Sequence, residues 1–159
     1  MPVGMTQDMT SQSSYWDRVA HEKRFSHPLR KTWLARYLNI QARILDYGCG
    51  YGRTLAELSD AGYENTFGMD FSESMLGRCR TAVPESRLIR NDGCGLPLKP
   101  GSFDAVLLFA VLTCVPDSNE QRLLVTAQHV CGLPVSGPQA DFRSGFSLCV
   151  AFVSSVSLW

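Results

Sequence analysis

The sequence predicts an α/β fold, a doubly wound and mostly parallel sheet with helices on both of its faces. Apolar runs with the length of strands alternate along the chain with segments whose apolar residues recur at helical spacing. A glycine cluster joins the first of these runs to the helix that follows it. Strands that alternate with helices in this way are typical of a parallel sheet built from successive βαβ units.

The first forty residues divide into a polar lead and a helical segment. Residues 1–14 contain few apolar anchors, and we expect them to be disordered because such a segment cannot offset the entropy lost on ordering. Residues 15–40 carry two sets of apolar side chains at helical spacing, separated by Pro28. The sets are Trp16, Val19 and Ala20, and then Leu29, Trp33, Leu34, Tyr37 and Leu38. Two helices are therefore predicted, with Pro28 in the first turn of the second.

The alternating elements occupy residues 41–131. The first strand is short and apolar, at residues 44 and 45, and it runs into the glycine cluster. A helix is predicted from near Tyr51 to Gly62, where glycine favours a left-handed cap. The remaining elements are a strand over 66–70, a helix over 72–81 capped by Ser72, strands over 87–92 and 103–111, and a helix over 119–130.

Composition and charge limit the classes of function. With 159 residues, 45% of them apolar, the chain is expected to form one compact domain. Fifteen basic side chains balance fifteen acidic ones without a long run of like charge, so we expect a small-molecule partner and neither nucleic acid nor a membrane. Residues 1–10 lack the features of a secretion signal, which makes a cytoplasmic location the default expectation. The six cysteines are widely spaced, which indicates reduced thiols and no metal site.

The turn over residues 46–52, Asp-Tyr-Gly-Cys-Gly-Tyr-Gly, is the strongest candidate for a ligand site. The three glycines Gly48, Gly50 and Gly52 let the backbone approach a ligand closely, and the positive end of the next helix favours a carboxylate there. S-adenosylmethionine carries such a carboxylate. A dinucleotide fingerprint would need a glycine where Arg53 stands, so the spacing argues against a pyrophosphate.

Two more carboxylates stand where the second and third strands are predicted to end. Asp70 follows the turn by about twenty residues, where a carboxylate can accept hydrogen bonds from both ribose hydroxyls. Asp92, with Gly93 after it, can meet the nitrogens of adenine, and Phe71 is placed to flank the base. Each acid alone is more often a helix cap or a solvated turn residue. Asp46, Asp70 and Asp92 in this order favour an adenosine-bearing cofactor.

These segments resemble a known family. Residues 44–53, ILDYGCGYGR, look like motif I of the class I S-adenosylmethionine-dependent methyltransferases, and residues 68–76, GMDFSESML, resemble the next motif. Residues 91–115 are similar to the third and fourth strand region of the branch that methylates quinones and other small metabolites. The resemblance covers roughly residues 15–131 and implies a Rossmann-like sheet that transfers a methyl group to a small-molecule acceptor by in-line displacement.

The resemblance also implies roles for single residues. The three glycines would surround the methionyl end of S-adenosylmethionine with Asp46 beneath it, and the ribose would be held by Asp70. Adenine would meet Asp92 and Gly93, and the backbone near Phe109 and Ala110 would approach the methionyl amino group. No metal is implied.

The acceptor side is predicted less fully. Family members often close the site with an N-terminal helix, which makes residues 15–40 a candidate lid through Tyr15, Trp16, Arg18, Phe25 and His27. For Trp16 and Phe25 a role as core anchors is favoured, because aromatic residues on amphipathic helices usually pack inside. Methyl transfer requires no base, since the sulfonium already activates the methyl group. If a base is used, His27 is the first choice, although as a weak candidate.

Residues 132–159 depart from the family pattern. The last sixteen residues contain no charged side chain, and their Phe, Val, Leu and Ser suit one strand, a short hairpin or an unrelated tail. The sheet is therefore expected to be incomplete at its C-terminal end. Two functions stay open, an active methyltransferase and a weak or inactive S-adenosylmethionine-binding remnant of one. A nicotinamide-dependent oxidoreductase is disfavoured because of Arg53.

Overall fold

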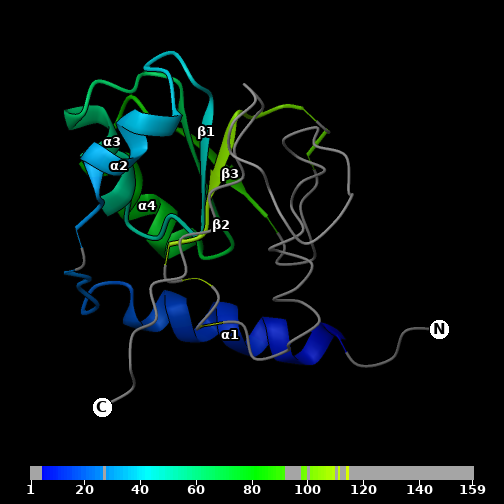
Figure 1. The fold of residues 1–159 in the computed structure, drawn as a ribbon. Coiled ribbons are helices and arrows are strands. Elements are labelled where there is room, and N and C mark those ends of the chain that lie inside the picture. Colours follow the sequence, from blue (N-terminus) through cyan, green and yellow to red (C-terminus); the bar gives the residue numbers. More distant parts are fainter. Residues whose placement is uncertain are drawn as a thin grey trace.

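In the part of the chain that the structure describes, four strands form a central parallel sheet (Figure 1). The computed structural model describes residues 5–26, 28–91, 98–99, 101–109, 111 and 114. The strand order is β3-β2-β1-β4, with each strand parallel to its neighbours. The strands are β1 Ile44–Tyr47, β2 Thr66–Asp70, β3 Arg87–Arg90 and β4 Ala105–Leu107. The order reverses between β1 and β4, and ligands of open α/β sheets bind beside such a reversal, at the carboxyl ends of the strands.

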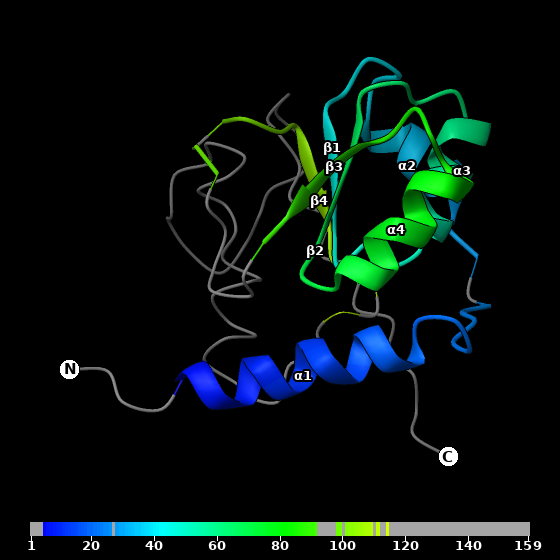
Figure 2. The ribbon, with the colours of Figure 1, turned by 180° about the vertical axis from the view of Figure 1, so that it is seen from behind.

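The described residues form four helices. They are α1 Met5–Val19, α2 Lys31–Tyr37, α3 Arg53–Asp60 and α4 Glu73–Ala82. Helices α2, α3 and α4 lie together on one face of the sheet, whereas α1 crosses the end at which the strands finish (Figures 1 and 2). This placement puts α1 over the edge where the predicted site residues stand.

Side chains of β1 and β4 alternate between two buried clusters. Ile44 and Leu107 belong to the cluster beneath the helices, together with Leu34, Leu55 and Leu76 of α2, α3 and α4. The neighbouring side chains on the strands point to the opposite face, where a second cluster is formed. Its buried members are Leu45, Tyr47, Met69, Phe103, Val106 and Leu108. Burial on both faces is typical of parallel strands, and the α/β fold with a parallel sheet is confirmed.

Local sequence signals explain several element boundaries. Strand β2 has the predicted bounds, and Ser72 caps α4 by accepting a hydrogen bond from the backbone N–H of Met75 at 3.1 Å. Gly62, the second residue after the end of α3, has a φ of 88°, a backbone conformation that glycine adopts without strain. Helix α3 begins at Arg53 rather than near Tyr51, since the turn continues through Gly52.

The N-terminal prediction needs correction. Helix α1 begins at Met5, so the disordered lead predicted over residues 1–14 is wrong from Met5 onward. Once the end of α1 is fixed on the domain, each further turn of helix adds a hydrogen bond per residue without a new nucleation cost. Amino-acid composition alone does not reveal this tertiary contact and therefore predicted disorder. Strands β3 and β4 are shorter than the predicted 87–92 and 103–111.

Two predicted elements, the helix over 119–130 and the divergent segment over 132–159, lie outside the described residues. Within the described part of the chain, no helix is long and apolar enough to cross a membrane.

Candidate cofactor site

The glycine turn between β1 and α3 has a backbone conformation that would be strained if residues other than glycine occupied it. Gly48, Gly50 and Gly52 have φ values of 72°, 54° and 86°, which lie in the left-handed region. At Gly52 an added Cβ would also meet the Cys79 sulfur at 2.5 Å, so the missing side chain lets the turn pack directly on α4. The turn is thereby fixed close to the ends of β1 and β2.

Hydrogen bonds tie the turn to β2. The backbone N–H groups of Gly48 and Cys49 donate to the carbonyl oxygen of Met69 at 2.7 and 3.0 Å. The N–H of Gly50 donates to Oδ2 of Asp70 at 2.9 Å. These three amides are therefore hydrogen-bonded within the protein. The positive end of α3 remains available to attract a negatively charged group. The approach of a ligand to the backbone of the turn stays a prediction.

Asp70 connects the turn to the start of α4. Its Oδ1 accepts from the backbone N–H of Ser72 at 2.9 Å, and its other oxygen accepts from Gly50. Burial raises the pKa of Asp70, and the hydrogen bonds from Ser72, Gly50 and Phe71 partly offset that effect. Each carboxylate oxygen can accept a further hydrogen bond, so Asp70 can bind hydroxyl groups without giving up its protein partners.

Asp46 is buried more deeply, with 2% of its surface exposed. Burial raises its pKa to about 8, an effect that nearby Arg53 opposes and Asp70 reinforces. Within the described part of the chain, Oδ2 of Asp46 has no hydrogen-bond partner. A buried carboxylate oxygen without a partner costs free energy, and a ligand amino group would satisfy it. The residues present therefore fit the amino acid end of S-adenosylmethionine.

Arg53 forms the other wall of the turn. Its guanidinium lies 4.9 Å from the centre of the Phe109 ring, and it is paired with Glu57 one turn along α3. Oε2 of Glu57 accepts from the backbone N–H of Leu29, which joins the N-terminal segment to α3. Phe109 is half-buried at the end of β4, so the structure brings it to the same edge as the turn.

The thiol of Cys49, inside the turn, packs against the core. Cys49 is 7% exposed, and its contact with Cys79 and its burial raise its pKa. A thiol that stays protonated is a poor nucleophile. Cys49 is therefore a packing residue, in agreement with the prediction of reduced, buried thiols.

Helix α1 is fastened over the carboxyl edge by Asp17. Its Oδ1 accepts from Oγ of Ser72 at 2.6 Å and from the backbone N–H of Ser74 at 3.1 Å. Burial acts to raise the pKa of Asp17, but the hydrogen bonds from Ser72 and Ser74 outweigh burial and lower it. A single carboxylate on a polar helix gives no sequence signal, because its partners stand more than fifty positions away.

Phe25 contacts the turn through Tyr51. The two rings are stacked with centres 6.0 Å apart, and the backbone N–H of Phe25 donates to the Tyr51 hydroxyl at 2.9 Å. Phe25 is 39% exposed, so the prediction that it anchors the core is wrong. Trp16 is half-buried and lies 6.4 Å from Phe25. Packing on the turn replaces packing in the core here, because the segment crosses the edge of the sheet.

Most predicted cofactor residues lie at one edge. Asp46, the three glycines, Asp70, Phe71 and Phe109 stand at the carboxyl ends of β1, β2 and β4 or in the turn between them. Asp92, Gly93 and the weak catalytic candidate His27 lie outside the described residues. Sequence reasoning missed the structural roles of Asp17 and Tyr51. The binding roles of the predicted cofactor residues remain predictions.

Comparison with known proteins identifies relatives for this region. The model of a family described as a methyltransferase domain matches residues 44–132. An 18S rRNA (guanine-N(7))-methyltransferase from Bos taurus is 34% identical over 89 residues, which are 55% of this chain and 31% of that protein. A demethylmenaquinone methyltransferase from Beutenbergia cavernae is 35% identical over 66 residues, 42% of this chain and 27% of that protein. A solved S-adenosylmethionine-dependent methyltransferase from Methanosarcina mazei is 26% identical with a TM-score of 0.57, and the match covers 67% of this chain and 53% of that one.

The first of these relatives contradicts the exclusion of nucleic acid. The Bos taurus protein is named for an RNA substrate and shares this region. The exclusion relied on the total charge of the chain, and a neutral total does not show how the charges are distributed. The matched region spans less than a third of either curated relative.

Proposed function

Because the chain belongs to the methyltransferase domain family and has the class I fold, we propose that it binds S-adenosylmethionine at the carboxyl edge of the sheet. We further propose that the protein transfers the methyl group to a base nitrogen of RNA, guanine N7. The observation that carries the cofactor proposal is the pair of buried carboxylates, Asp46 and Asp70, on either side of the glycine turn.

Each of these residues has a distinct proposed task. Asp70 accepts hydrogen bonds from the ribose hydroxyls while Gly50 and Ser72 hold its carboxylate in place. Asp46 accepts from the amino group of the methionyl end, for which its Oδ2 is suited. The positive end of α3 faces the methionyl carboxylate. Helix α1, fixed by Asp17, restricts the access of water to this edge.

The proposed reaction needs no catalytic acid or base at this edge of the sheet. When bound, S-adenosylmethionine supplies a methyl group on a sulfonium, which an acceptor lone pair can take by in-line displacement. Guanine N7 carries an in-plane lone pair and no proton, so its methylation leaves no proton to remove. The task of the protein is then alignment of the acceptor with the methyl group. The RNA methyltransferase among the relatives supports this acceptor.

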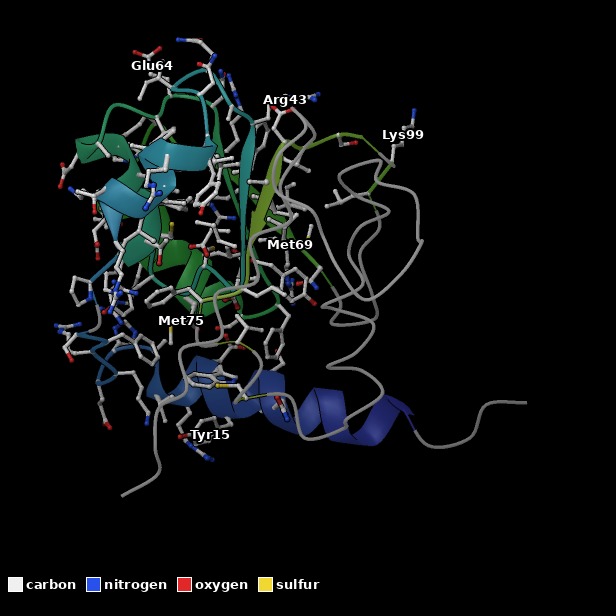
Figure 3. The ribbon with its side chains drawn as sticks, in the orientation of Figure 1. Tyr15, Arg43, Glu64, Met69, Met75 and Lys99 are labelled. Carbon is white, nitrogen blue, oxygen red and sulfur yellow. The ribbon has the colours of Figure 1, made fainter. Side chains whose placement is uncertain are left out.

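Calorimetric titration tests the cofactor proposal. The purified 159-residue chain is titrated with S-adenosylmethionine and, separately, with a nicotinamide dinucleotide. We expect saturable binding of S-adenosylmethionine alone, and binding at least about tenfold weaker in Asp70→Ala, since a buried charged hydrogen-bond acceptor is removed. The matched control is Glu64→Ala, an exposed carboxylate at the opposite end of the strands from Tyr15 (Figure 3). Equal affinity in both variants would overturn the proposed site.

Methyl transfer tests the acceptor proposal. RNA oligonucleotides that contain guanine, or 7-deazaguanine in its place, are incubated with the chain and S-adenosylmethionine labelled in the methyl group. We expect label in guanine RNA only, because 7-deazaguanine lacks the N7 lone pair. Binding of S-adenosylmethionine without transfer to RNA or to a quinone acceptor would indicate the remnant instead. Transfer to the quinone alone would refute the RNA acceptor.

A further inference from the structure

A row of aromatic rings leads from the cofactor turn to the surface. Tyr51 stacks on Phe25, Phe25 lies beside Trp16, and Trp16 meets the edge of Tyr15 at 5.2 Å between ring centres. We call these four residues the aromatic row. Two of the rings, Tyr15 and Phe25, are each 39% exposed, although large aromatic side chains are costly to leave in water.

Basic residues are frequent in the sequence near Tyr15 and Phe25. Residues 18–31 contain five Lys and Arg residues against a single acid, Glu22, although the whole chain is neutral. We call residues 18–31 the basic segment. Arg18, Lys23 and Arg24 are exposed in the structure, and the Arg18 guanidinium lies 5.8 Å from the centre of the Tyr15 ring. Three exposed cations, Arg18, Lys23 and Arg24, therefore lie close in sequence to the exposed rings Tyr15 and Phe25.

The basic segment is fixed to the cofactor site rather than merely near it. The backbone of Phe25 is hydrogen-bonded to the Tyr51 hydroxyl, and Arg78 of α4 lies 4.5 Å from the centre of the Tyr51 ring. Arg78 also donates a hydrogen bond to the carbonyl oxygen of Ala20. A ligand held by this surface is held at a constant position relative to the glycine turn.

We propose that the aromatic row and the basic segment form a binding surface for single-stranded RNA. Tyr15 and Phe25 stack on bases, while Arg18, Lys23 and Arg24 contact the phosphates. Exposed rings interleaved with cations are the combination that single-stranded nucleic acid requires, because every base has a stacking face and every linkage a negative charge. This proposal extends the proposed RNA methylation by naming where the RNA binds. It rests on that proposed function for the identity of the methyl acceptor.

Fluorescence anisotropy of a labelled single-stranded RNA tests the surface without the cofactor. The 159-residue chain is titrated at several salt concentrations. For Lys23→Ala/Arg24→Ala we expect weaker binding and a salt slope reduced by about 1.4, or roughly 0.7 for each phosphate of a single strand that is no longer neutralised. For Tyr15→Leu/Phe25→Leu, which keep apolar bulk, we expect affinity reduced about tenfold with the slope unchanged.

The matched control is Arg80→Ala/Lys99→Ala. Arg80 is paired with Glu73, and Lys99 is an exposed cation at the opposite end of the strands from Tyr15 (Figure 3). RNA affinity and slope in the control should equal those of the unchanged chain, and melting temperatures confirm that each variant is folded.

Three results would overturn the proposal: no RNA binding by the unchanged chain, equally weakened binding in the control, or binding to anionic lipid vesicles in place of RNA. The calorimetric titration with S-adenosylmethionine is run on the same samples. A chain that binds one ligand and not the other thus shows which of the two proposals has failed.

Discussion

Asp46 and Asp70 end neighbouring strands, yet their surroundings give them different properties. Burial raises the pKa of Asp70, and hydrogen bonds from backbone N–H groups partly offset that effect. Asp46 is buried with an unsatisfied oxygen within the described part of the chain, and burial raises its pKa to about 8. A buried ionisable residue whose charged form destabilises the protein is typical of a functional site.

Replacing Asp46 should therefore stabilise the protein. The pKa of Asp46 rises from 3.8 to about 8 on folding, so between these values the native state binds more protons than the unfolded state and stability falls as pH rises. Asp46→Asn cannot ionise and escapes this destabilisation. We expect the variant to exceed the unchanged chain by more than about 1 kcal/mol at pH 8, with the gap closing toward pH 4.

Thermal unfolding across this pH range measures the gap. Binding of S-adenosylmethionine should weaken in the same variant, because the Asp46 carboxyl can release its proton and pair with the ligand amino group whereas Asn cannot ionise. The difference in melting temperature between Asp46→Asn and the unchanged chain should grow from pH 4 to pH 8. A constant difference would contradict the raised pKa of Asp46.

Gly52 should be intolerant of any side chain. Gly52→Ala imposes a φ of 86° on alanine and drives its Cβ against the Cys79 sulfur, which together should cost about 2–4 kcal/mol. Gly77 is the matched control, since it lies within α4 and a Cβ there meets nothing within 4 Å. Gly77→Ala should raise the free energy of unfolding by about 0.5–1 kcal/mol. Urea unfolding of both variants tests this contrast, and equal effects would refute it.

At the scale of elements, the contact between α1 and α4 decides how the carboxyl edge is covered. Ser72 caps α4 and donates to Asp17 of α1, so one side chain serves both the helix start and the connection between helices. Asp17 also accepts from the N–H of Ser74 in the first turn of α4, where a negative charge is favoured. The covering helix is thus coupled to the end of β2.

Asp17→Asn should loosen this contact in a pH-dependent way. The pKa of Asp17 is lowered in the folded protein, so its stabilisation is present above its unfolded value and disappears as pH falls through the folded value. We expect a destabilisation of about 1 kcal/mol at pH 7 and a smaller one at pH 2. Denaturant unfolding at both pH values measures it, with Glu64→Gln as an exposed control. A destabilisation that persists unchanged at low pH would exclude the charged hydrogen bonds as its cause.

At the scale of the whole molecule, the strand order β3-β2-β1-β4 gathers residues from distant parts of the chain. The turn after β1, Asp70 after β2 and Phe109 after β4 all reach one edge because the strands are parallel. A ligand at this edge would contact several strands at once. Its binding energy would therefore add to the stability of the whole sheet.

S-adenosylmethionine should accordingly raise the melting temperature. At a hundred times the dissociation constant, a ligand that binds only the folded state adds about 2.7 kcal/mol, which corresponds to roughly 5 °C or more for a domain of this size. Differential scanning fluorimetry measures the shift, with Asp70→Ala expected to show little of it. An equal shift in Asp70→Ala would place the ligand elsewhere.

The sequence by itself determined the elements and their order within residues 44–107. Apolar periodicity located β1, β2 and α4, and the glycine spacing located the turn, because these signals arise from contacts between near neighbours in the chain. The cofactor candidates Asp46 and Asp70 followed from their places at strand ends. The family followed from the same motifs, and the match over residues 44–132 confirms it.

Only the tertiary structure decided how the N-terminal segment is used. Two contacts of this segment join residues at least 26 positions apart: the hydrogen bond between Asp17 and Ser72, and the contact of Phe25 with Tyr51. The start of α1 at Met5 depends on such contacts. Local sequence propensity does not include these long-range contacts. The sequence therefore predicted a disordered lead over residues 1–14 and a core position for Phe25. The basic segment was overlooked for a related reason: total charge averages over the chain, whereas a binding surface depends on where the fold places each charge.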